Sequence, residues 1–154
     1  MKRLVSLLFV LVLFLESAAW AGLGSGKAMY VGGTTKGIAE RTEGTSSMAD
    51  DGFIFTHKGG KLTIPYAQVN GLEYGQKAGR RVGMAIAISP LLLFSKKRRH
   101  YLTISYLDDH KQQQAAVFEL GKDAIRPTLS GLEAKTSKKI EYQDDEARKS
   151  GTGK

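Results

Sequence analysis

Cysteine is the residue that this chain lacks entirely, since none of its 154 residues is one. Its absence excludes disulfide bridges, a cysteine nucleophile and lipid attachment through a thiol. It also excludes the thiolate ligands that most structural zinc sites use. A chain of this length can still bury a hydrophobic core without cross-links, so we expect one folded domain.

Motifs for catalysis and metal binding are equally scarce. The only histidines are His57, His100 and His110, and no two stand four residues apart as in a helical zinc site. No G-x-S-x-G sequence is present. The paired acids do not match a calcium loop and indicate turns or tail; they are Asp50-Asp51, Asp108-Asp109 and Asp144-Asp145. We therefore predict no metal, no cofactor and no enzyme activity, with a triad built from distant residues as the open alternative.

A hydrophobic run long enough to cross a membrane is also missing. Residues 4–15 form an apolar run of 12, against the ~20 that a spanning helix needs. Lys2 and Arg3 precede this run, and Ala19-Trp20-Ala21 follows it, which is the pattern of a signal peptide and its cleavage site. We predict that residues 1–21 direct export to the periplasm or the exterior. Retention of these residues as an amino-terminal anchor is the alternative.

The charge balance is strongly basic, with a formal net charge of +8. Loss of residues 1–21 removes two cations and one carboxylate, which leaves +7 on the mature chain. A basic exported protein is attracted to anionic lipid and polyanionic glycans, and nucleic acid is not expected as a partner there.

Alternating hydrophobicity predicts a mainly β domain over residues 27–142. In residues 101–107, Leu102, Ile104 and Tyr106 share one face. Residues 123–136 place Ile125, Leu129 and Leu132 on one side of an amphipathic helix. Residues 22–26 are predicted to be a flexible start, and residues 143–154 a disordered tail. The predicted strands cover residues 28–32, 45–49, 53–57, 61–66, 69–74, 101–107 and 113–120.

Two stretches carry a resemblance to a known superfamily. They are LTIPYAQVNGLEY (residues 62–74) and residues 100–134, where HYLTISYLDD is followed by AAVFELGKDAIRPTLSGLEA. This order resembles the pleckstrin-homology-like superfamily, including its bacterial and GRAM-type members. The resemblance implies a bent antiparallel barrel of about seven strands, closed at one end by a carboxy-terminal amphipathic helix. It also implies a module that binds lipids or peptides rather than a catalyst.

The sequence RRVGMAIAISPLLLFSKKRR, residues 80–99, places an apolar insertion between two basic clusters. As a helix, residues 82–94 would span about 20 Å, which is short of ~30 Å of hydrocarbon. Pro90 would also kink such a helix. Three interpretations remain: core packed on the barrel, an element that dips into one leaflet, or a protein-docking and oligomer contact.

We predict that this segment attaches the protein peripherally to a membrane or to an envelope protein. Anionic groups would meet the cations Arg80, Arg81, Lys96, Lys97, Arg98 and Arg99. The apolar contact would come from Leu91, Leu92, Leu93 and Phe94. The alternative is a structural or assembly protein that uses residues 82–94 as an interface. The ligand and the oligomeric state are left open by the sequence.

Overall fold

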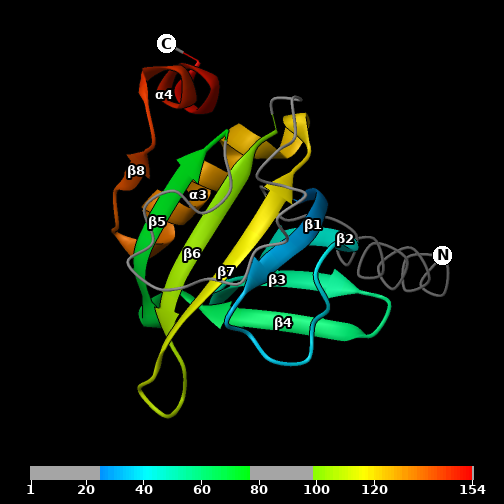
Figure 1. The fold of residues 1–154 in the computed structure, drawn as a ribbon. Helices are drawn as coiled ribbons and strands as arrows, with labels where there is room; N and C mark the ends of the chain where they lie inside the picture. Colours follow the sequence, from blue (N-terminus) through cyan, green and yellow to red (C-terminus); the bar gives the residue numbers. More distant parts are fainter. Residues whose placement is uncertain (1–24, 77–98, 154) are drawn as a thin grey trace, which may run out of the picture.

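The computed structural model of the chain describes residues 25–76 and 99–153. Within them, eight strands form one sheet, and two α-helices lie in the carboxy-terminal part of the chain, one before and one after the last strand (Figure 1). The strands are β1 (Gly26–Gly33), β2 (Thr42–Met48), β3 (Gly52–His57), β4 (Gly60–Pro65), β5 (Val69–Gly75), β6 (Tyr101–Leu107), β7 (Gln113–Leu120) and β8 (Ile140–Tyr142). The helices are α3 (Ile125–Thr136) and α4 (Asp145–Thr152).

The strand order is β4-β3-β2-β1-β7-β6-β5-β8, and every pair is antiparallel except β5 with β8. The predicted mainly β fold with a carboxy-terminal helix is confirmed. Two details differ from the prediction. The short β8 adds an eighth, parallel strand beside β5, and the order is linear between β4 and β8, so the described sheet is not closed.

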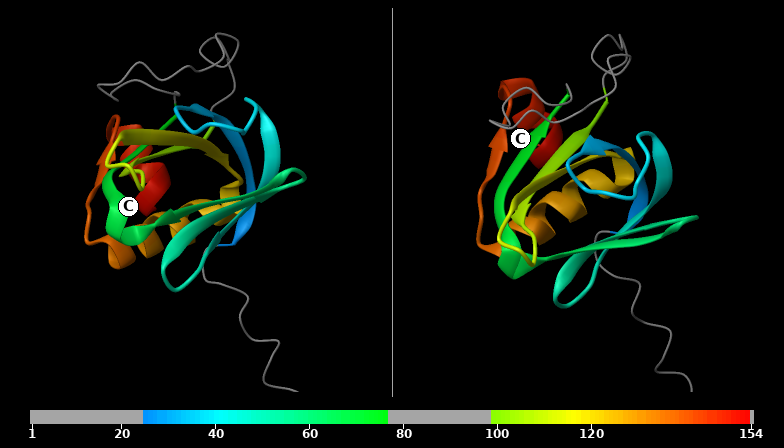
Figure 2. Two further views of the ribbon diagram at one scale, coloured as in Figure 1. Left: turned by 90° about the horizontal axis from the view of Figure 1, so that it is seen from below. Right: turned by 60° about the horizontal axis from the view of Figure 1, so that its bottom comes forward.

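Helix α3 lies across the concave side of the curved sheet (Figure 2). Its buried face contains Ile125, Leu129 and Leu132, as the helical spacing predicted. The helix begins one residue before Arg126-Pro127, so Pro127 falls in the first turn, where its missing N–H costs nothing. A 12-residue helix of this kind depends on packing for its stability, and the sheet supplies that packing.

The aromatic centre of the core is Phe118 on β7. Its ring centroid lies 5.2 Å from those of Phe53 and Phe55 on β3 and 5.8 Å from that of Tyr30 on β1. These separations and tilted planes are the arrangement that aromatic quadrupoles favour. Because these partners lie on β1 and β3, Phe118 connects β7 to two other strands across the core.

The prediction of a disordered tail is wrong for residues 145–152, which form α4. Asp144 caps this helix by accepting a hydrogen bond of 2.7 Å from the Ala147 amide. Ala147 is fully buried, and a side chain at Gly151 would collide with Tyr142 and Leu129. The helix therefore packs closely through its two smallest residues, which a search for large apolar residues overlooks. Gly26 likewise belongs to β1 rather than to a flexible start.

The predicted signal peptide, residues 1–21, and the apolar insertion, residues 82–94, lie outside the described residues. Within residues 25–76 and 99–153, no helix has the length and apolar character needed to cross a membrane. The same residues contain no group of three or more His, Asp or Glu that could hold a metal ion.

Packing of α3 on the sheet generates a stability prediction. Leu132→Ala should lower the free energy of unfolding by about 2–5 kcal/mol, because it leaves a cavity at a fully buried site. Ser130→Ala on the exposed side of the same helix should change it by no more than about 0.5 kcal/mol. Urea unfolding followed by circular dichroism measures both. Equal effects would show that α3 is not docked as described.

Candidate functional site

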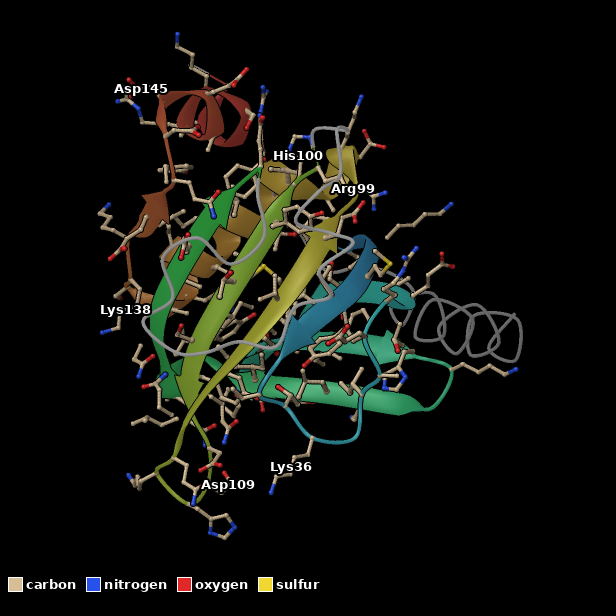
Figure 3. All side chains as sticks on the ribbon, viewed as in Figure 1. Lys36, Arg99, His100, Asp109, Lys138 and Asp145 are labelled. Atoms are coloured by element: carbon tan, nitrogen blue, oxygen red, sulfur yellow. The ribbon has the colours of Figure 1, made fainter. Side chains whose placement is uncertain are left out.

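Of the ten predicted contact residues, the structure describes Arg99 alone. The other nine lie outside the described residues: Arg80, Arg81, Leu91, Leu92, Leu93, Phe94, Lys96, Lys97 and Arg98. Arg99 stands two residues before β6, and its Nη1 donates to Glu119 Oε2 on β7 at 2.7 Å. Figure 3 shows Arg99 and His100 together at one end of the sheet, and Asp109 at the other.

A row of register partners crosses five strands next to Arg99. Gly75 on β5 pairs with Tyr101, which pairs with Glu119; Met29 on β1 pairs with Glu119 and also with Glu43 on β2. Side chains in register on neighbouring strands point to the same face. This face is opposite to the one that carries Leu102 and Phe118, and we name it the outer face.

A groove of about 730 Å³ runs over the outer face at this end of the sheet. Three cations line it, namely Lys27, Arg41 and Arg99. The remaining polar side chains in the lining include Glu43 and Glu119, while Met29 and Leu120 contribute apolar wall. The lining therefore combines a small excess of positive charge with apolar surface, and it adjoins the point where the basic segment rejoins the sheet.

One of the two carboxylates in the lining already offsets the charge of a groove cation. Glu119 is committed to Arg99, and this hydrogen bond, together with the charge, raises the pKa of Arg99. Lys27 and Arg41 are exposed and form no ion pair with another described residue. They are thus the groove's available cations, although the sequence analysis did not single out Lys27 for a role.

A second polar cluster lies on the inner side at the same end of the sheet. The buried hydroxyl of Tyr74 lies 2.6 Å from His100 Nδ1 and 3.2 Å from Ser150 Oγ on α4. Burial lowers the pKa of His100, and the positive charge of Lys122 lowers it further. Ser150 donates to the carbonyl of Ala147 rather than to the imidazole, so the cluster lacks a serine–histidine pair. It joins α4 to β5 and to the start of β6.

The outer face also holds an apolar cluster that the sequence analysis missed. Val31 and Val117 are fully buried and Tyr101 is 3% exposed, with Met29 packed against them. The continuous run Ala115-Ala116-Val117-Phe118 was the available signal, because such runs indicate burial on both faces of a strand.

Comparison with protein-family models and with curated proteins finds no match to this chain. Its function is therefore inferred from its own residues.

The half-buried imidazole of His100 generates a prediction about pH. A histidine whose folded-state pKa is lowered contributes stability that is complete above its unfolded pKa, near 6.5, and is lost as the pH falls through the folded value. The urea midpoint of the natural chain should therefore fall between pH 7 and pH 5. His100→Gln should lose part of this dependence, and His110→Gln, at an exposed turn, should keep all of it. Identical pH profiles for all three proteins would contradict the prediction.

Proposed function

We propose that this protein is an exported, non-catalytic binding module of the pleckstrin-homology-like class that associates with an anionic membrane surface. The contact is electrostatic, between lipid phosphates and two groups of cations. One group is the basic clusters of residues 80–99, and the other is Lys27 and Arg41 in the groove.

The observation that carries the proposal is the continuity of these two groups. Arg99 ends the basic segment and is also part of the groove wall, beside Lys27 and Arg41. Five further cations precede Arg99 within residues 80–98, and that stretch contains no acidic residue. The three cations of the groove are therefore continuous with the basic segment through Arg99.

The magnitudes favour a reversible attachment. Each Lys or Arg near an anionic membrane contributes about 1 kcal/mol, so the seven cations other than Arg99, which is paired with Glu119, can supply several kcal/mol in total. This attraction is screened strongly by salt, because the Debye length falls from ~10 Å at 0.1 M to ~3 Å at 1 M. A membrane contact of this type is consequently lost at high ionic strength.

Sedimentation with lipid vesicles tests the proposal. The chain should pellet with vesicles containing one-third phosphatidylglycerol and stay in solution with pure phosphatidylcholine, and 1 M salt should release it. Lys27→Gln with Arg41→Gln removes two cations, so partitioning should fall roughly 30-fold for a loss of ~2 kcal/mol.

The matched control is Lys138→Gln with Lys139→Gln. This pair removes the same charge from an exposed turn that lies away from Arg99 (Figure 3). Its partitioning should stay much closer to that of the natural chain. Equal losses in the two double variants would show that only net charge matters and would remove the groove from the proposal. A stable oligomer in light scattering, with no response to lipid, would support the assembly alternative instead.

A further inference from the structure

The middle of the sheet is buried on both faces. Residues 101–104 of β6 are all buried, and so are residues 115–118 of β7. Since successive side chains of a strand point to opposite faces, each of these strands needs cover on two sides. Helices α3 and α4 contribute to the cluster on the inner side, through Leu129, Leu132 and Ala147 among others.

On the outer face the described residues supply no such cover. The apolar cluster of Val31, Val117, Tyr101 and Met29 comes from β1, β6 and β7 alone, and no described helix contributes to it. Val31 and Val117 are nevertheless 0% exposed. Neighbouring side chains within a sheet do not shield one another this completely, so another part of the chain must lie over this face.

Tyr101 adds a second, independent observation. Its hydroxyl is buried and has no hydrogen-bond partner among the described residues. A buried hydroxyl normally finds a partner, because leaving one unpaired is costly. Burial also raises the pKa of this tyrosine. The element that covers the outer face is therefore expected to bring an acceptor or donor to Tyr101.

The connectivity points to the occupant. The stretch of residues 77–98 leaves the sheet just after Gly75 and returns just before Tyr101, and these two residues are register partners on β5 and β6. Both ends of the stretch are thus fixed at one edge of the apolar cluster. Three strand spacings from β5 to β1 amount to about 14 Å. Residues 82–94 span about 20 Å even as a helix, which is enough to cross that distance.

The composition agrees with the connectivity. Residues 82–95 contain no charged side chain. Arg80 and Arg81 precede this run, and four basic residues, 96–99, follow it, of which Arg99 lines the polar groove. An apolar run of this kind fits a dry, apolar surface. Its flanking cations fit the wet edge, where Lys27 and Arg41 are exposed.

We infer that the outer face formed by Val31, Tyr101 and Val117 is the docking surface of this chain's own residues 82–94. Leu91, Leu92, Leu93 and Phe94 then belong to a second core and do not enter lipid. The proposed membrane contact is left to the cations on either side. This inference does not depend on lipid binding, so its test contains no lipid.

The absence of cysteine allows a direct test by thiol labelling, because any introduced cysteine is the only one. Val117→Cys is placed in the full chain, once with natural residues 82–94 and once with a Gly/Ser sequence of equal length. The thiol should be protected in the first protein and react at least about tenfold faster in the second. Thr63→Cys, which is exposed on β4, provides the unprotected reference, and Ile104→Cys on the inner face of β6 reports that the fold persists.

Two results would overturn the inference. The first is rapid reaction of the Val117→Cys thiol while the natural run is present, because this would mean that the outer face is open. Protection that persists after the replacement, with a folded inner face, would assign the cover to residues 1–24 or to a second copy of the chain.

A second measurement decides the matter if the replaced chain fails to fold. Val117→Cys is combined in turn with Ile86→Cys, Ile88→Cys and Leu92→Cys in the otherwise natural chain. A disulfide forms only where the two Cα atoms come within about 7 Å. At least one pair should oxidise to a monomeric disulfide, and the same partners combined with Thr63→Cys should not. Failure of all three Val117→Cys pairs would overturn the inference.

Discussion

The middle of β6 and of β7 is buried on both faces, so both sides of the sheet must be covered by other parts of the protein. Leu102 and Ile104 point toward α3, while Tyr101 and Thr103 point the other way and are also buried. A two-sided sheet of this kind cannot be completed by one carboxy-terminal helix. It divides the molecule into an inner core centred on Phe118 and a smaller outer cluster around Val117.

The candidate site, the groove that contains Arg99, lies at the border of the outer cluster. Met29 belongs to the edge of the cluster and also to the groove wall, so apolar and charged surfaces meet at this residue. Glu119 fixes Arg99 at the same boundary through a 2.7 Å ion pair. The exposed Lys27 and Arg41 then line the same groove as Arg99. These three cations share one groove because strand register brings β2, β1, β7 and the start of β6 together.

Much of the inner fold could be predicted from the sequence, because large apolar residues alternate there. Leu102, Ile104 and Tyr106 on β6 are buried as predicted, and so are the helical positions Ile125, Leu129 and Leu132. Helix α4 could not be found in this way, since its contacts use Ala147 and Gly151, whose small size matters only against Tyr142 and Leu129. The ion pair of Arg99 was equally hidden, because Glu119 is 20 residues away in sequence.

The described residues on either side of 77–98 are held by specific hydrogen bonds. Arg99 is bound to Glu119 on the outer face, and the next residue, His100, contacts Tyr74 on the inner side. At the other end, Gln143 donates through its amide to the carbonyl of Tyr74 and through its side chain to Glu73, at 3.0 and 2.9 Å. Since these anchors lie on neighbouring strands, they fix the separation and direction of both chain ends. The anchoring therefore determines where the chain leaves β5 and where it enters β6.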